Sequence, residues 1–529
     1  MCGIAGCFGI RDTKTINLML DALPHRGPDD RGIFTRDNLV FGHTRLSIVD
    51  VARGHQPILA NGGNTGVICN GEIYNFQDLK KRLAAKYQFK TESDTEAILH
   101  LYRDKGAECV RYLDGMFAFA IFDGDNFMLA RDPIGIKPLY YGYVDSKLYF
   151  TSELGAMTLS GVDEVHEFPA GHYYTPKSGF VQYYKIPRID NYLLADVEET
   201  CTQIRETFIK AVKKRLLSDK EIHVGSFCSG GLDSSLVAAI AADEIPHLHT
   251  FVVGMKDSSG EESDDLKASR IAARHIGSTH HELIFTEEDY YEALPIVINK
   301  LESYDPSLVR CAVPCYFTCK LAADYVTVVL TGEGADEIFT GYHYMKHYPM
   351  DVLNQEARRC ISNLHNINLQ RADRMGMYFS LELRVPFLDV SMIDLAMKIP
   401  PELKIHESEL DGNMIEKWIL RKAFENTGYL PDEILWRYKV QYTQGAGCED
   451  LGEKLAHSEM SEDEYEQIKA QNPNAEINSR EAAYYFKIFR QFHPQDSVLS
   501  SIGIWTGFDF DEEKERVRGT MDGALRHVH

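Results

Sequence analysis

Short runs of alternating apolar and polar positions dominate the first 185 residues. Glycine, aspartate and asparagine bound these runs, which is typical of β-strands separated by turns. Between them, Ile98, Leu101 and Tyr102 share one helical face, and Gly106 follows as a stop signal. The pattern predicts a helix over residues 94–106. The predicted strands are residues 39–50, 65–75, 115–123, 126–132 and 147–153.

From about residue 200, apolar runs alternate with longer segments of helical spacing. Alternation of strand and helix at this rhythm predicts a parallel, doubly wound sheet. Ligands of such sheets bind beyond the carboxyl ends of the strands, and two glycine-rich loops fall at that edge. The predicted strands are residues 221–229, 247–255 and 325–334, and the predicted helices are residues 234–244 and 264–277.

The change of pattern predicts two α/β domains, residues 1–185 and 200–529. Residues 186–200 are interpreted as the linker, and the charged tail from about Asp511 is expected to be poorly ordered. No fixed-period repeat or low-complexity block interrupts either domain.

Composition narrows the functional classes. The 529 residues are 44% hydrophobic and 26% charged, and the formal net charge is −23. Such an acidic surface disfavours nucleic acid and anionic membranes as partners, although a local nucleotide pocket remains possible. No apolar run approaches a membrane-spanning length, and the amino terminus lacks a secretory signal. The 11 cysteines are therefore expected to be reduced thiols in a cytoplasmic compartment.

The first candidate site begins at Cys2. Removal of Met1 would give Cys2 a free α-amino group beside its thiol. That amine has a reference pKa of about 7.7–8.0, so it can serve as the base for its own nucleophile. A cysteine at this position can also arise by chance, so the neighbouring motifs decide the interpretation.

Those motifs are HRGPDD (25–30), RLSIVD (45–50), NGEIYN (70–75) and SDTE (93–96). Arg45 suits a carboxylate, while Glu72 and Asp94 suit an ammonium group. Asn70 and Gly71 could donate N–H groups to an oxyanion. Together these groups fit an amino acid with a side-chain amide. Singly, they also fit a turn at Asn70-Gly71, a surface charge and a helix N-cap.

These segments resemble the glutamine-hydrolysing domain of the N-terminal-nucleophile amidotransferases in type and order. The resemblance implies a four-layer αββα sandwich in which Cys2 attacks the glutamine amide and releases ammonia. Asn70 and Gly71 would form the oxyanion hole. The glutamine-binding residues that it implies are Arg45, Leu46, Ser47, Ile48, Val49, Asn70, Gly71, Glu72 and Asp94.

The second candidate site is SGGLDSS, residues 229–235, between a predicted strand and a predicted helix. Its glycines let the backbone approach an anion, and the helix start supplies free N–H groups. Asp233 suits such a loop if Mg²⁺ accompanies ATP. TGEGADE (331–337) ends another strand, and its Asp336 could share the metal with Asp233. An ordinary glycine turn is the alternative.

This half resembles the synthetase domain of the glutamine-dependent asparagine synthetases. The match also includes AVKKRLLSDKEI (211–222), TFVVGM (250–255), ESYDPSLVR (302–310), ADRMGMYFSLELRVPFLD (372–389) and LPDEILWRYK (430–439), so the resemblance spans nearly the whole chain. It implies that Glu333 assists ammonia transfer and that Lys439 and Arg310 steady phosphate charge. The implied ATP-contacting residues are Cys228, Ser229, Gly230, Gly231, Leu232, Asp233, Ser234, Ser235, Val253, Thr331 and Gly332.

The resemblance implies asparagine synthesis from aspartate, ATP and glutamine through a β-aspartyl-AMP intermediate, in a protein that can be a homodimer. A dry passage for ammonia between the sites is a further hypothesis. The alternatives are a relative that adenylates another carboxylate, a non-catalytic regulatory relative and a stand-alone glutaminase. Retention of Cys2, Asn70 and Asp94 together with the second loop disfavours all three.

Two other features have alternative interpretations. Cys311, Cys315 and Cys319 share one helical face, which favours core packing over a metal cluster. Arg384 stands among apolar residues and could be a buried, paired charge near the domain interface.

Overall fold

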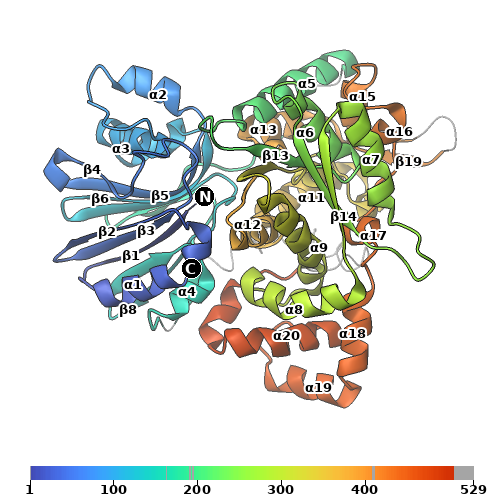
Figure 1. The fold of residues 1–529 in the computed structure, drawn as a ribbon. Coiled ribbons are helices and arrows are strands. Elements are labelled where there is room, and N and C mark those ends of the chain that lie inside the picture. The colour runs from blue at the N-terminus through green and yellow to red at the C-terminus, as the bar shows by residue number, and fades with distance from the viewer. Residues whose placement is uncertain (1, 163, 190–191, 193–195, 408–411, 506–529) are drawn as a thin grey trace.

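The computed structural model of the chain describes residues 2–162, 164–189, 192, 196–407 and 412–505. Two α/β halves lie side by side, the first coloured blue to teal and the second green to red (Figure 1). The sheets of the first half are antiparallel, whereas the large sheet of the second half is parallel. The predicted fold class is thus confirmed.

Two six-stranded sheets form the centre of the first half. One has the order β10-β8-β9-β1-β3-β2 and the other the order β12-β11-β7-β6-β5-β4. The first sheet consists of β1 (Gly3–Phe8), β2 (Asp30–Arg36), β3 (Leu39–Arg45), β8 (Tyr140–Val144), β9 (Lys147–Thr151) and β10 (Val165–Glu167). The second consists of β4 (Ile58–Ala60), β5 (Thr65–Ile73), β6 (Gly115–Asp123), β7 (Asn126–Arg131), β11 (His172–Thr175) and β12 (Gly179–Gln182).

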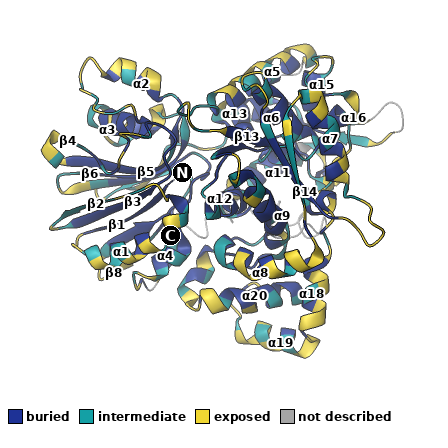
Figure 2. Ribbon diagram, in the orientation of Figure 1, coloured by how far each residue is buried: buried dark blue, intermediate teal, exposed yellow. Residues whose placement is uncertain are grey.

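Helices cover the outer faces of these sheets, which gives the four layers expected for this half (Figure 1). Helices α1 (Thr13–Asp21) and α4 (Leu154–Thr158) pack on the first sheet. Helix α3 (Asp94–Lys105) packs on the second sheet and beside α2 (Phe76–Leu83). Buried side chains such as Phe41, Phe122 and Phe150 fill the space between the sheets. Figure 2 shows the central strands β1, β3, β5 and β6 mostly buried, whereas the residues of the edge strand β2 are partly or fully exposed.

The second half contains a five-stranded parallel sheet of order β15-β14-β13-β16-β17. The chain order reverses between β13 and β16, so the crevice beyond these two strands is where such sheets bind ligands. The strands are β13 (Val224–Phe227), β14 (His249–Gly254), β15 (Thr279–Ile284), β16 (Val328–Leu330) and β17 (Glu382–Arg384), and a separate ribbon pairs β18 (Ile405–Glu407) with β19 (Met414–Glu416).

Apolar clusters lie on both faces of the parallel sheet. Val328 and Leu330 join the cluster that contains α5, α6 and α13, whereas Val329 joins the cluster that contains α8, α9 and α12. The helices are α5 (Val197–Lys214), α6 (Leu232–Ala242), α7 (Asp264–Ile276), α8 (Glu287–Leu301), α9 (Pro306–Ala323), α10 (Ala335–Ile338), α11 (Met350–Asn363), α12 (Asn368–Tyr378), α13 (Val390–Lys398), α14 (Pro401–Lys404), α15 (Trp418–Phe424), α16 (Asp432–Leu435), α17 (Tyr442–Ala446), α18 (Leu451–Glu459), α19 (Glu462–Gln471) and α20 (Arg480–Phe492).

The predicted strands and helices all occur, with ends shifted by a few residues. Helix α5 begins at Val197, so the end of the predicted linker is helical, with Asp196 as the N-cap. Residues 190–191 and 193–195 of that linker, and the tail from Asp511, lie outside the described residues.

Candidate active sites

Strands β1 and β5, from the two facing sheets of the first half, bring Cys2 and Asn70 together. Cys2 directly precedes β1, and its backbone nitrogen donates to Asn70 Oδ1 at 3.2 Å. The Nδ2 group of Asn70 is buried without a hydrogen-bond partner in the described part of the chain. A buried N–H donor without an acceptor is costly unless a ligand satisfies it. Asn70 thus presents a free donor beside the nucleophile, as an oxyanion hole requires.

Gly71 lies inside β5 rather than in a turn, so the turn interpretation of Asn70-Gly71 is wrong. It pairs with Phe117 of β6. A Cβ atom at position 71 would lie 2.1 Å from the Met116 carbonyl oxygen. The close approach of the two strands therefore requires glycine here and keeps the backbone beside Asn70 in place.

Arg45 at the end of β3 organises the loop that follows it. Its guanidinium donates to the carbonyls of Val49 and Asp50, at 3.1 and 2.7 Å, and to that of Val51 at 3.1 Å. Arg45 is thus buried and has a structural role, and its carboxylate-binding role remains a prediction. Leu46, Ser47, Ile48 and Val49 form this loop, and all four are buried.

The same loop contacts the second half of the chain. The Asp219 nitrogen donates to the Ile48 carbonyl at 3.0 Å, and Asp219 Oδ2 accepts from the Val51 nitrogen at 2.9 Å. The Leu46 carbonyl lies 4.0 Å from Cys2 Sγ. The loop beside the nucleophile is therefore held from both halves.

Asp94 at the start of α3 and Glu72 near the end of β5 are both buried and close enough to interact electrostatically. Asp94 accepts from the Ile73 and Thr95 nitrogens, both at 2.8 Å, and Ser93 rather than Asp94 is the N-cap of α3. Burial raises the pKa of Asp94 to about 6. Burial and repulsion from Glu382 and Asp94 also raise the pKa of Glu72. Two buried carboxyl groups with raised pKa values form a suitable site for a ligand ammonium group, which would favour their ionised forms.

Cys2 is 7% exposed, and burial raises the pKa of its thiol. Such a thiol is a weak nucleophile until a base removes its proton. The adjacent α-amino group of a processed chain would be that base.

In the second half, the loop after β13 has the form of an anion cradle. Gly230 has a φ of +75°, and a Cβ atom there would lie 2.3 Å from the Ala268 backbone. Gly231 is the N-cap of α6 and supplies no side-chain acceptor, so the first N–H groups of the helix remain available. Ser234 Oγ lies 3.1 Å from both Ser229 N and Ser229 Oγ. The predicted pyrophosphate loop is therefore compact and preformed.

The other predicted ATP-contacting residues lie in this cradle or next to it. Leu232, Asp233, Ser234 and Ser235 form the first turn of α6. The Cys228 nitrogen donates to Phe251 at 2.9 Å, which ties the loop to β14, the strand that contains Val253. Thr331 and Gly332 follow β16, and a Cβ atom at Gly332 would lie 2.8 Å from Ser234 N. The two glycine-rich loops thus meet beyond β13 and β16.

Asp233 and Asp336 come together where these loops meet. A residue that the sequence patterns did not indicate joins them: Lys417 Nζ lies 2.5 Å from Asp233 Oδ2 and 2.5 Å from Asp336 Oδ1. Lys439 Nζ lies 2.8 Å from Asp336 Oδ2. Burial opposes ionisation of Asp336, but Lys417 and Lys439 outweigh it and lower its pKa.

The residues fit Mg²⁺. Asp233 Oδ1 is buried and has no hydrogen-bond partner among the described atoms. Mg²⁺ is usually held by one or two carboxylates together with phosphate oxygens, and Asp233 and Asp336 supply such a pair. In the part of the chain that the structure describes, no group of three or more histidine, cysteine or acidic side chains is arranged to hold a metal ion. This applies also to Cys311, Cys315 and Cys319.

Glu333 forms an ion pair with Arg371 of α12. Burial disfavours the charge on Arg371, but Glu333 outweighs burial, and the pKa of Arg371 is raised. Beside this pair, burial and the charge of Asp336 raise the pKa of Glu337 to about 7. Arg371 is a second residue that the sequence patterns missed, because it precedes the matched segment by one position.

Arg310 lies elsewhere. It pairs with Glu481 of α20, and its Nη2 lies 3.4 Å from Glu453 of α18. Its contacts among the described residues thus join α9 to these two helices, and no phosphate-loop residue is among them. Its predicted role at the phosphates remains an expectation.

Arg384 is fully buried and paired, which bears out its interpretation. Its Nε donates to Glu382 at 2.6 Å, and its Nη2 lies 4.0 Å from Glu72 of the first half. It therefore lies at the interface, between the two sites.

A pocket of about 780 Å³ lies at the opposite end of the parallel sheet, among Val224, His249 and Thr279 at the strand starts. Its position excludes it as the nucleotide site of a doubly wound sheet.

None of the helices that the structure describes is both long and apolar enough to cross a membrane.

Two family models match the chain. A glutamine amidotransferase domain model matches residues 1–186, and an asparagine synthase model matches residues 203–359 and 346–475. Three relatives are each 38% identical to the chain. They are a probable glutamine-hydrolysing asparagine synthetase of Dictyostelium discoideum (96% of each chain covered), glutamine-hydrolysing asparagine synthetase 1 of Arabidopsis thaliana (95% of this chain, 88% of the relative) and glutamine-hydrolysing asparagine synthetase B of Escherichia coli K12 (95% and 93%).

Proposed function

Because the chain belongs to the glutamine-hydrolysing asparagine synthetase family, we propose that its two sites divide the reaction between Cys2 and the phosphate cradle. The enzyme is an ATP-dependent carbon–nitrogen ligase that makes asparagine with glutamine as nitrogen donor. The observation that carries the residue assignments is the presence of both preformed sites in one chain: an unpartnered Asn70 donor beside Cys2, and a glycine cradle beside Asp233 and Asp336.

In the first site, the α-amino group of processed Cys2 takes the thiol proton, and the sulfur attacks the glutamine side-chain carbon. Asn70 Nδ2 and the Gly71 backbone hold the resulting oxyanion. The C–N bond then breaks, the amine returns its proton to the leaving nitrogen, and ammonia departs. Water hydrolyses the thioester to release glutamate and regenerate the thiol.

The substrate amino acid is held by opposite charges. The carboxyl groups of Asp94 and Glu72 face its ammonium group, and Arg45 with its loop faces its carboxylate. Because these groups are buried, each contact is stronger than it would be in water. Their burial also keeps bulk water from the thioester until ammonia has left.

In the second site, an aspartate β-carboxylate oxygen attacks the α-phosphorus of ATP, and pyrophosphate leaves. Residues Ser229–Ser235 hold the pyrophosphate with hydroxyl and backbone N–H donors, and Lys439 faces the same charge. Asp233 and Asp336 would hold Mg²⁺, which supplies charge neutralisation for the phosphates when bound.

Ammonia then attacks the β-carbonyl carbon of the adenylate. Glu333 accepts a proton from the attacking nitrogen as the bond to AMP breaks, and its ion pair with Arg371 supports an orienting role for that arginine. The products are asparagine and AMP. Ammonia is a nucleophile only while it is unprotonated, so we propose that it travels through the buried interface between the sites.

We propose a reducing, cytoplasmic location, in keeping with the free state of all the cysteines, residues 2 to 448. We also propose that two copies of the chain can form a homodimer.

Product analysis tests the function. The purified enzyme with ATP, Mg²⁺ and glutamine should release AMP and pyrophosphate only when aspartate is supplied, and asparagine should form in equal amount. Cys2→Ala should abolish synthesis from glutamine and spare synthesis from ammonia. Cys201→Ala, the same change at a buried cysteine of α5, is the matched control and should leave both activities unchanged. Loss of both activities in Cys2→Ala would contradict the two-site mechanism.

A further inference from the structure

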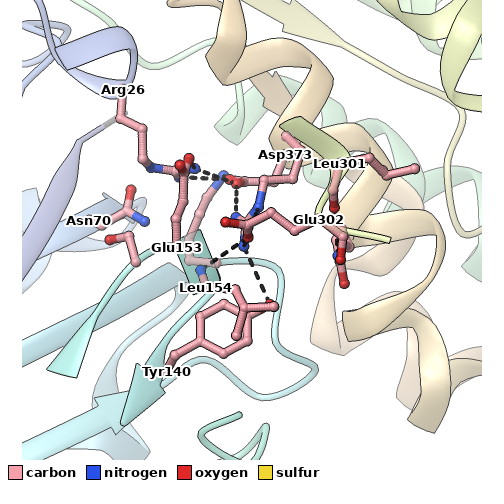
Figure 3. Close-up of polar contacts among 12 residues, drawn as sticks. Arg26, Asn70, Tyr140, Glu153, Leu154, Leu301, Glu302 and Asp373 are labelled. Atoms are coloured by element: carbon pink, nitrogen blue, oxygen red, sulfur yellow. Dashed lines mark hydrogen bonds and ion pairs between the residues drawn. The ribbon is translucent and has the colours of Figure 1, made fainter. Parts of the chain in front are cut away.

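Helix α12 contacts both active sites. Arg371 of this helix pairs with Glu333 in the second site. Asp373 follows two residues later, about 200° around a helix, so its side chain leaves the opposite side. Figure 3 shows Asp373 turned toward Arg26 and Glu153 of the first half. One helix therefore connects Glu333 to the glutamine-hydrolysing half.

Asp373 holds Arg26 with two hydrogen bonds, 2.7 Å from Nη1 to Oδ2 and 3.1 Å from Nη2 to Oδ1. Arg26 is fully buried, and its Nη1 also donates to Glu153 at 2.9 Å. Its Nε donates to the Cys2 carbonyl at 3.1 Å. Because guanidinium is planar and rigid, fixing its two Nη groups also fixes its Nε. Asp373 is thereby linked to the nucleophilic residue through a single side chain.

Arg374 links Asp373 to a second contact between the two halves of the chain. Its Nη1 donates to Asp373 at 3.1 Å, and its Nε and Nη2 donate to Glu302 at 3.0 and 2.8 Å. Glu302 in turn accepts from the Leu154 and Gly155 nitrogens of the first half, at 3.0 and 2.6 Å (Figure 3). Asp373 is thus held between two arginines.

The charges of this cluster keep Asp373 ionised. Burial opposes ionisation, but Arg26 outweighs burial and lowers the pKa of Asp373. Lys137 Nζ adds a cation 4.0 Å from Asp373 Oδ1. A buried ion network of this kind contributes little net stability, and its best-attested use is to fix one arrangement of the surrounding groups.

We propose that Asp373, a residue of the synthetase half, is a positioning residue for Cys2 that acts through Arg26. Helix α12 then aligns both sites at once, since Arg371 orients Glu333 while Asp373 orients the Cys2 backbone. The proposal rests on the proposed function of Cys2. It predicts that glutamine hydrolysis requires a carboxylate from the other half of the chain.

Asp373→Asn tests the proposal in the full-length enzyme. The amide keeps the size of the side chain but loses the charge and one acceptor for Arg26. We expect kcat for glutamate release to fall about tenfold or more, because a small misplacement of a nucleophile costs up to about a hundredfold. The KM for glutamine should stay within about twofold of wild type, as should synthesis from ammonia. Alkylation of Cys2 by iodoacetamide should slow in parallel with hydrolysis.

Asp394→Asn is the matched control. Asp394 of α13 also accepts a hydrogen bond across the two halves, from Tyr184 at 3.1 Å, but neither residue contacts Cys2 or Arg26. It should behave as wild type in every assay. If Asp373→Asn does not fold, Asp373→Glu, which keeps the charge and moves the carboxylate by one methylene, should fold and show the same selective loss of glutamine hydrolysis.

Two outcomes would overturn the proposal: glutamine hydrolysis unchanged in the folded variant, or equal loss of glutamine- and ammonia-dependent synthesis. Failure of the proposed function is distinguishable, because wild-type enzyme would then make no asparagine from either nitrogen source.

Discussion

The effect of removing the Lys417 ammonium group on stability can be worked out from the structure. Lys417 is 2% exposed and lies 2.5 Å from a carboxylate oxygen of both Asp233 and Asp336. Lys417→Met keeps most of the apolar stem and deletes the ammonium group. Among the residues that the structure describes, the two carboxylates then keep Lys439 as a close cation, at 2.8 Å from Asp336.

Breaking a buried ion pair costs about 3–5 kcal/mol. Asp233 and Asp336 keep 15% and 19% exposure, so water screens part of the loss, and the lower end applies. We therefore expect the free energy of unfolding to fall by about 3 kcal/mol. For a cooperative unit of roughly 300 residues, this corresponds to a fall in Tm of about 5 °C.

Differential scanning calorimetry of the full-length protein measures the change. Addition of Mg²⁺ with pyrophosphate should raise the Tm of Lys417→Met more than that of wild type, because the cation replaces the missing charge between the carboxylates. Lys454→Met is the matched control, since Lys454 is 65% exposed and lies 4.0 Å from Asp450. An unchanged Tm in Lys417→Met, with no larger response to Mg²⁺, would refute the electrostatic reasoning.

Three further predictions concern the two sites. Gly71→Ala places a methyl group 2.1 Å from a carbonyl oxygen of the neighbouring strand. Steady-state assays should show glutamine hydrolysis reduced about a hundredfold, with ammonia-dependent synthesis retained; equal rates with glutamine would contradict the oxyanion assignment. Asp94 has a pKa raised to about 6 by burial, so it is ionised above that pH and protonated below it. Calorimetric binding of glutamine to Cys2→Ala should therefore weaken about tenfold from pH 8 to pH 5, and the added change Asp94→Asn should flatten this dependence. Arg371→Met leaves Glu333 without its cation, so asparagine formation should fall with either nitrogen source while glutamate release continues; unchanged synthesis would exclude the orienting role.

Local patterns predicted most of the architecture. The alternation in residues 115–123 and the helical spacing in residues 94–106 each act over a few neighbouring positions. Burial and backbone conformation determine such features locally. Cys2 and Asn70 could be paired from sequence only through a resemblance, because they are 68 residues apart.

The patterns missed contacts that depend on long-range packing. Lys417 reaches Asp233 across 184 positions, and Asp373 reaches Arg26 across 347 positions. A lysine in an apolar helix start gives no local sign of a partner that distant. Arg310 is a further example. Its short-range motif did not indicate its pairing with Glu481, which is 171 positions away.

The most direct test of the mechanism is the mass of the amino-terminal peptide from enzyme that is active with glutamine. Loss of Met1, with the chain beginning at an unmodified Cys2 and glutamine turnover proportional to the processed fraction, is the predicted result. A chain that retains Met1 and still hydrolyses glutamine at the full rate would contradict the assignment of the Cys2 amine as the base.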